Sequence, residues 1–292
     1  MDNQTRLLIA KDDIHKTFES SDRVVFKRKD LATVLDENRE FWRLTQAISL
    51  SDFIAFLMES GDLRMHRLKF PARAELRYTW GDVSDFVLIQ SLRSNSYFSH
   101  FTALGYHGLT MQIPKTVYLN HEQAKKRATQ ADLSQDGIDR AFRNRCRASG
   151  NIAEFNDKRV CILNGKFTDQ KGVINATDAF GRTFRVTDVE RTLIDCVVRP
   201  VYAGGVQTVL EAFKSASEVV SVNRLAAMLR QLDFVYPYHQ AIGFYLERSG
   251  VYSEDQIAVV ERFDMEFDFY LVHQMKNSSY TKRWRIHYPS GF

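Results

Sequence analysis

The segment SLSDFIAFLMESGDLRMHRLKFP, residues 49–71, decides the fold of the first part of this chain, because a helix pattern runs directly into a strand pattern. Ser49 or Ser51 can cap the helix, since a hydroxyl oxygen accepts a hydrogen bond from an N–H group of the first turn. The buried face is predicted to consist of apolar residues at helical spacing, namely Phe53, Ile54, Leu57 and Met58. Gly61 is expected to end the helix, and the basic and apolar residues that follow are typical of a strand.

The residues before this segment carry the other elements of a small domain. Residues 1–20 have helix-like apolar spacing, RVVF at 23–26 is a short extended piece, and residues 27–44 return to helical spacing. The order helix, short strand, helix, helix, basic strand is that of a winged helix-turn-helix. In such a module the third helix enters the major groove of DNA. We therefore expect a winged helix-turn-helix DNA-binding domain over residues 1–78.

Charged and polar residues of this domain are candidates for DNA contacts. Phosphates are contacted by Lys and Arg, whereas bases are read by side chains that can form hydrogen bonds with base edges. The candidate set is Arg28, Lys29, Ser49, Ser51, Asp52, Arg64, His66, Arg67 and Lys69. Residues 1–76 contain 13 Lys and Arg residues and 13 Asp and Glu residues, so a protein-interaction domain without net charge is the alternative.

The remaining residues, 79–292, mix helix and strand patterns. Predicted strands lie at 116–120, 158–167, 172–178, 182–188, 265–275 and 282–289. Predicted helices lie at 95–110, 134–147, 188–198, 202–216, 221–232 and 237–249. Strands and helices do not alternate regularly, so the predicted fold class is α+β, with the winged helix-turn-helix followed by a larger mixed α+β domain.

The predicted helix at 134–147 is the most basic part of the chain. Its apolar stripe would contain Ile138 and Phe142, and arginines would lie on the other side. Arg140, Arg143 and Arg147 are therefore candidates for a surface that binds a nucleic acid or an acidic partner. An ordinary solvated helix face is the alternative.

The stretch RVTDVERTLIDCVVRP, residues 185–200, concentrates acidic and basic residues and could be read as a catalytic centre. Thr187 and Glu190 have the spacing of a capping box, which gives Glu190 a structural role. The spacing of Asp188, Arg191, Asp195 and Arg199 places them on one stripe of alternating charge. We therefore interpret this stretch as a buried helix and expect no catalytic residue in it.

An enzymatic alternative rests on three acids near the end of the chain. Asp264, Glu266 and Asp268 occupy alternating positions and could bind Mg²⁺ in a metal-dependent nuclease, although the polar face of a strand explains them more simply. His100 and His107 have no third ligand at suitable spacing, and AGG at 203–205 lacks the ending of a phosphate-binding loop. The sequence therefore predicts no catalytic residue, no metal site and no cofactor.

Composition favours a cytoplasmic protein. Hydrophobic residues make up 44% of the 292 residues, which is enough for folded cores, and the net charge of +4 is compatible with a nucleic-acid partner. The chain has three cysteines, an odd and widely spaced set that does not indicate a disulfide framework. Charged residues interrupt the first 16 positions, and no apolar stretch reaches the length of a membrane span, so neither a signal peptide nor a membrane is expected.

Three segments carry a resemblance to a known family. SYFSHFTALGYHGLTMQIPKTVYLN at 96–120, RVTDVERTLIDCVVRPVYAGG at 185–205 and YPYHQAIGFYLERSG at 236–250 occur in the expected order. They resemble the AbiEi-type antitoxins of bacterial abortive-infection, or type IV toxin–antitoxin, systems. The resemblance covers about residues 80–292.

This resemblance implies a function. Such proteins use an N-terminal winged helix to bind inverted repeats in double-stranded operator DNA and repress their own operon, while the second domain counteracts a nucleotidyltransferase-like toxin. Counteraction need not involve a stable complex with the toxin, although an interaction module that sequesters the toxin directly remains an alternative. The predicted third helix contains no Arg or Lys, so the wing and the Lys27–Lys29 run would have to supply most phosphate contacts.

Overall fold

The computed structural model describes residues 2–125 and 133–292 of a mixed α+β protein. The chain divides into two compact units, each of which is described by itself. Unit 1 consists of Met1–Ser94, Ala153–Asn156 and Thr177–Phe184, and unit 2 consists of Asn95–Ile152, Asp157–Ala176 and Arg185–Phe292. No helix within the described ranges has the length and apolar character needed to cross a membrane.

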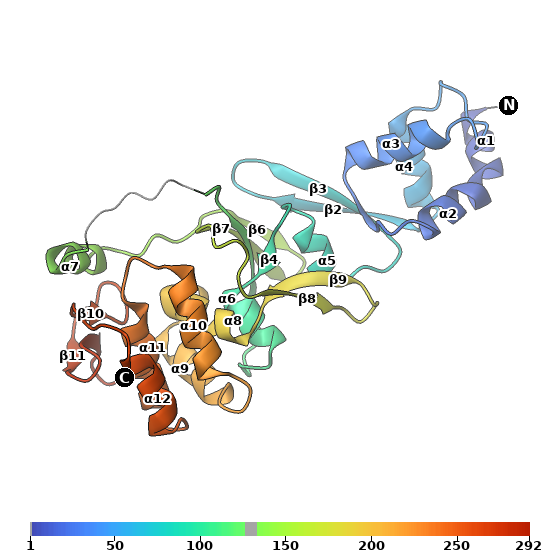
Figure 1. Ribbon diagram of the computed structural model, residues 1–292. Coiled ribbons are helices and arrows are strands. Elements are labelled where there is room, and N and C mark those ends of the chain that lie inside the picture. The colour runs from blue at the N-terminus through green and yellow to red at the C-terminus, as the bar shows by residue number, and fades with distance from the viewer. Residues whose placement is uncertain (1, 126–132) are drawn as a thin grey trace. The chain divides into compact units, whose positions relative to one another are not determined.

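Unit 1 begins with five helices and three strands (Figure 1). Its elements are α1 (Asn3–Ile9), α2 (Lys11–Glu19), β1 (Val25–Phe26), α3 (Arg28–Asn38), α4 (Leu50–Glu59), β2 (Leu63–Lys69), β3 (Ala74–Trp80) and α5 (Asp85–Gln90). The strands form an antiparallel sheet in the order β1-β3-β2. The order of helices and strands through β2 is the one expected from the sequence, except that the predicted first helix is divided into α1 and α2. Strand β3, which the sequence did not indicate, completes the sheet.

Helices α1 to α4 enclose an aromatic core against one face of this sheet. Phe18 from α2 stacks on Trp80 of β3, with ring centroids 4.4 Å apart, and lies 6.5 Å from the ring of Phe53 in α4. The expectation that Met58 belongs to the buried face of α4 is wrong, because Met58 is 38% exposed. Phe56 is buried in its place, since it follows Phe53 by three positions on the same side of the helix.

Unit 2 contains a sheet, a group of helices and a second small sheet. The helices are α6 (His100–Tyr106), α7 (Gln135–Arg143), α8 (Val189–Val198), α9 (Val206–Ser215), α10 (Val222–Leu232), α11 (Tyr238–Ser249) and α12 (Glu254–Glu261), with a 3₁₀ turn at Pro200–Tyr202. The strands are β4 (Tyr97–Phe98), β5 (Thr116–Glu122), β7 (Lys158–Gly165), β10 (Phe269–Tyr270), β11 (Ser278–Thr281) and β12 (Ile286–Pro289); β6 (Ile152–Phe155), β8 (Val173–Thr177) and β9 (Thr183–Thr187) cross the unit boundaries. The central strands are ordered β7-β5-β4-β9, with β5 parallel to β7 and antiparallel to β4.

Helix α8 is the centre of the helical part of unit 2. It packs against α6, α9, α10 and α11, and Figure 1 shows it among them. The predicted buried helix is therefore confirmed. Close packing extends to α11, where Gly243 lies against the ring of Trp284; a Cβ atom at Gly243 would stand 1.9 Å from that ring. Only glycine fits this position without displacing the indole.

Two predicted elements of unit 2 are wrong in their extent. The expected helix at 95–110 begins only at His100, because Tyr97 and Phe98 form strand β4. The expected strand at 265–275 is reduced to Phe269–Tyr270. In the segment before it, the Phe267 carbonyl accepts a hydrogen bond from the Gln240 side chain and the Asp268 N–H donates to Gln135, so side chains replace a strand ladder.

Candidate nucleic-acid interface

The β2–β3 ribbon carries basic side chains on both of its faces. Strand pairing places Arg67 opposite Leu76 and Lys69 opposite Ala74, on the face that also carries Tyr78 and Trp80 of the core. Both basic side chains are exposed. Arg67 and Lys69 therefore lie on the ribbon face that covers α1 to α4, at positions beyond the edge of the aromatic core.

The other two candidates in β2 lie on the opposite face. Arg64 pairs with Asp82 at 3.1 Å, and both side chains are largely exposed. His66 is half-buried, its Nε2 lies 2.9 Å from the hydroxyl of Thr79, and its ring is 6.0 Å from that of Phe155. Burial lowers the pKa of His66, so the imidazole is neutral at neutral pH. The four candidates in β2 thus form two pairs on different surfaces.

The first turn of α4 brings together candidates from two helices. The guanidinium of Arg28, at the start of α3, donates a 2.8 Å hydrogen bond to the hydroxyl of Ser51. Ser49 and Asp52 form a capping box: the Asp52 N–H donates to Ser49 Oγ at 3.1 Å, and Asp52 Oδ2 accepts from the Ser49 N–H at 3.1 Å. Of the two predicted caps, Ser49 and Ser51, the structure confirms Ser49. Hydrogen bonds from Ser49 lower the pKa of Asp52, which keeps its charge close to Arg28.

The solvent side of α4 carries no cation. Its exposed residues are Ser51, Asp52, Ala55, Met58 and Glu59. Lys29, one position beyond Arg28, is also exposed. Positive charge is therefore available at the start of α3 and on the ribbon, on either side of α4 along the chain, while α4 offers small, apolar and acidic side chains.

The predicted partner surface lies on and beyond α7. Arg140, Arg143 and Arg147 are exposed, whereas Ile138 and Phe142 are buried, as the amphipathic pattern indicated. The helix ends at Arg143 and does not continue to 147. Its last carbonyls have other partners: the Asn144 side chain donates to the Arg140 carbonyl, and the Gln274 N–H donates to the Phe142 carbonyl.

The expected capping box at the start of α8 is wrong. Asp188 is the N-cap, because its Oδ1 accepts a hydrogen bond from the Arg191 N–H at 2.8 Å. Glu190 serves a different helix: its Oε1 accepts from the N–H of Ser221, the N-cap residue of α10. The predicted ladder of four charges is reduced to one internal pair, since Asp188 contacts Arg224 instead.

The remaining pair of this ladder is buried. Arg191 Nε donates to Asp195 Oδ1 at 2.8 Å, and its other nitrogens donate to the Thr168 hydroxyl, the Lys171 carbonyl and the Tyr97 hydroxyl. Burial opposes the charge of Arg191, but the Asp195 carboxylate holds the pKa of the guanidinium above its ordinary value. These bonds tie α8 to β4 and to the segment before β8, which agrees with a structural role for the whole stretch.

His100, His107 and Asp268, the other candidates for catalysis or metal binding, include no free cluster in the part of the chain that the structure describes. His100 Nδ1 lies 2.8 Å from the Ser99 hydroxyl, and His107 Nε2 lies 2.6 Å from the Thr187 carbonyl. Asp268 pairs with Arg285 at 3.1 Å, whereas Asp264 and Glu266 are exposed on an irregular segment. Within residues 2–125 and 133–292, no group of three His, Cys, Asp or Glu side chains could hold a metal ion.

Comparison with known proteins shows the fold of the chain. It is similar to the crystal structure of the RV2827C protein from Mycobacterium tuberculosis, with a TM-score of 0.57 and 14% sequence identity; the match covers 98% of this chain and 90% of that chain. No protein-family model and no curated protein matches the sequence. The chain is therefore an α+β protein whose fold resembles that of RV2827C along nearly its full length.

Proposed function

We propose that this protein is a DNA-binding antitoxin and transcriptional autorepressor of a bacterial type IV toxin–antitoxin operon, without enzymatic activity. In this proposal the β1-β3-β2 sheet with α3 and α4 is a winged helix, α4 is its recognition helix and the β2–β3 ribbon is its wing. The antitoxin role rests on the resemblance of residues 80–292 to AbiEi-type proteins.

The observation that carries the DNA-binding role is the position of Arg67 and Lys69. Both are exposed, and both lie on the ribbon face that is turned toward the helices. A wing would contact a DNA duplex docked on α4 with this face. Arg28 and Lys29 would contact phosphate at the start of α3. Ser51, Ala55 and Met58 would face the groove, so phosphate contacts would supply most of the affinity.

The test is a gel shift of the purified protein with the DNA upstream of its own gene at several salt concentrations. We expect a specific shift on a fragment that contains inverted repeats, with an affinity that falls steeply as salt rises. Equal affinity for the upstream fragment and for unrelated DNA would overturn the repressor role. Co-expression with a neighbouring nucleotidyltransferase-like gene tests the antitoxin role through rescue of growth.

A second candidate is direct binding of the toxin by unit 2. It is favoured by the exposure of Arg140, Arg143 and Arg147. The segment from residue 140 to 147 contains four arginines and no acidic residue. Such a surface suits an acidic partner. Co-purification of the toxin, lost when the three arginines are replaced by Gln, would support this candidate, and rescue of growth without any complex would oppose it.

A further inference from the structure

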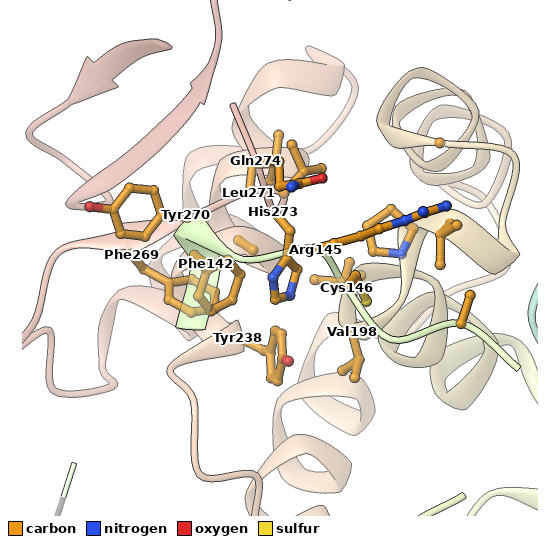
Figure 2. A pocket seen from close by; sticks show the side chains of 17 residues that line it. Phe142, Arg145, Cys146, Val198, Tyr238, Phe269, Tyr270, Leu271, His273 and Gln274 are labelled. Carbon is orange, nitrogen blue, oxygen red and sulfur yellow. The ribbon is translucent and has the colours of Figure 1, made fainter. Parts of the chain in front are cut away.

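A pocket of about 300 Å³ lies in unit 2, beside the basic run at 140–147. Its walls come from segments that are distant in sequence: the end of α7 and the residues after it, the end of α8, the start of α11, and β10 with the loop that follows (Figure 2). This volume is at the lower end of the range of small-molecule sites. It suits a ligand that has one or two fused rings.

Aromatic side chains make up much of the wall. The rings of Phe142 and Phe269 meet edge to face with centroids 4.8 Å apart, and Tyr238 meets Phe269 in the same way at 5.4 Å. The imidazole of His273 stacks on Phe142 at 4.3 Å. Figure 2 shows His273 between Phe142 and Cys146, with Tyr238 below. These mutual contacts fix the rings in place, so a planar ligand would meet a preformed surface.

His273 presents a specific polar atom to this pocket. Its Nδ1 lies 3.2 Å from the Ala141 carbonyl and 3.1 Å from the Asn144 carbonyl, so Nδ1 carries the proton and donates it. Burial lowers the pKa of His273, and the ring is neutral at neutral pH. Nε2 is then a hydrogen-bond acceptor, and it has no partner within residues 2–125 and 133–292. A ligand that bears a ring-bound N–H or O–H group would satisfy it.

The mouth of the pocket is cationic. The exposed side chain of Arg145 lines it, and the flanking exposed arginines, Arg143 and Arg147, carry no compensating acid between them. Tyr238, inside, stays uncharged, because burial raises the pKa of its phenol to about 12. An anionic group at the mouth would therefore be attracted, while the interior favours an uncharged ring.

We propose that this pocket binds a small aromatic anion, with the ring against Phe142 and Tyr238, a ring-bound donor on His273 Nε2, and the anionic group on Arg145. A nucleoside monophosphate and a hydroxylated aromatic carboxylate share this chemistry. This site is independent of DNA binding by unit 1.

The experiment measures binding of AMP and of 6-hydroxy-2-naphthoate to the full-length protein by calorimetry and thermal shift, with adenosine and 2-naphthol as uncharged counterparts. We expect at least one anion to bind and to raise the melting temperature, and its counterpart to bind at least about tenfold more weakly. The preferred anion identifies the source of the ligand. Absence of binding by both anions at roughly millimolar concentration would overturn the proposal.

Two substitutions locate the site. Ala148→Trp changes an exposed residue that lines the pocket, so it should block binding while the protein remains folded. Arg145→Gln should weaken binding on the order of tenfold. The matched control is Arg262→Gln, at an exposed arginine that does not line the pocket, and it should change nothing. Unchanged binding by a folded Ala148→Trp protein would contradict the assignment.

Cys146 offers a second readout that is independent of melting. The chain has three cysteines, of which Cys161 and Cys196 are buried and Cys146, in the pocket wall, is half-buried. Maleimide labelling of the folded protein should therefore occur at Cys146, and the bound anion should slow it. Labelling of Cys146 at the same rate with and without a saturating anion would show that the ligand lies elsewhere.

Discussion

The carboxylate of Glu190 accepts a hydrogen bond from the backbone N–H of Ser221, 2.9 Å away and 31 positions further along the chain. Ser221 is the N-cap of α10, whose first N–H groups have no partner inside the helix. A side chain of α8 thus satisfies the start of α10. Glu190 also lies 3.3 Å from Arg224 and is 2% exposed, so little water could replace these contacts.

Replacement of Glu190 by Ala should therefore destabilise the protein. We expect a loss of about 2–3 kcal/mol in the free energy of unfolding, because the partly buried N–H group of Ser221 loses its acceptor. Arg224→Ala, which removes only the exposed partner, should cost less than about 1 kcal/mol. Urea unfolding measures both values. Equal losses for the two variants would show that Glu190 stabilises the protein through its ion pair with Arg224 and not by capping α10.

Asp195→Ala should be more damaging, because it leaves the Arg191 guanidinium buried without its carboxylate. The expected cost is about 3–5 kcal/mol. The control is Glu211→Ala, which breaks an exposed ion pair with Lys214 three positions further along a helix and should cost no more than about 0.5 kcal/mol. Loss of an exposed ion pair costs at most about 1 kcal/mol. A cost this small for Asp195→Ala would mean that water reaches Arg191.

Gly243→Ala should be poorly tolerated, because the new methyl group would overlap the ring of Trp284, which is fully buried. Overpacking of this kind typically costs about 1–3 kcal/mol or more. Gly150→Ala is the control, since nothing lies within 4 Å of a Cβ atom built there. Thermal melting of the two variants checks the prediction, and similar melting temperatures would contradict the close packing described for α11.

The two faces of the β2–β3 ribbon should respond differently in DNA binding. Arg67→Ala combined with Lys69→Ala should reduce the slope of log affinity against log salt by about 2, because each phosphate contact contributes about 1. Arg64→Ala removes a similar charge from the opposite face, where Asp82 already pairs with it, and should leave the slope nearly unchanged. The reverse pattern would show that DNA meets the other face of the wing.

Stability should fall as the pH is lowered from about 7 to 5. Burial lowers the pKa of His100 from its ordinary value of 6.5 to about 4, so the unfolded state binds a proton that the folded state does not. The contribution of neutral His100 is complete above pH 6.5 and is lost progressively as the pH falls toward 4. His239, whose pKa burial also lowers to about 4, acts in the same direction.

His100→Asn isolates the first of these groups. Asparagine tolerates the positive φ of 53° at this position better than most residues. The variant should be less stable than the original protein at pH 7.5. Between pH 7 and 5, its unfolding should take up as much as one proton fewer than unfolding of the original protein does. Urea unfolding at several pH values measures the difference. An unchanged pH dependence would mean that the pKa of His100 does not differ between the folded and unfolded states.

Helix starts and single strands were largely predictable, because they depend on residues close together in sequence. Ser49 caps its helix as expected, β2 and β7 lie within the predicted segments, and β5 extends two residues beyond its predicted segment. Strand β3 was missed for a physical reason. Its buried positions include Glu75 and Arg77, which form an ion pair with each other at 3.2 Å, and Arg77 also donates hydrogen bonds to Ser91 and Leu92. Charged residues at these positions hide the apolar alternation of a strand.

The candidate functional sites were also predictable only where they depend on residues close together in sequence. Sequence identified the basic residues of β2 but not their faces, because pairing with β3 sets which side chains share a surface. It gave no sign of the pocket, since Phe142, Tyr238 and His273 come from separate elements and none stands out locally.

By itself, the sequence determined the α+β class, the order of elements in residues 1–69 and the structural character of residues 185–200. Hydrogen-bond caps and apolar periodicity act over a few residues, and they are readable in the chain. Only the tertiary structure decided that Glu190 caps α10, that Arg67 and Arg64 lie on opposite faces, and that an aromatic pocket lies beside the arginines. Each depends on partners brought together from distant positions, and close packing selects those partners only when the whole chain has folded.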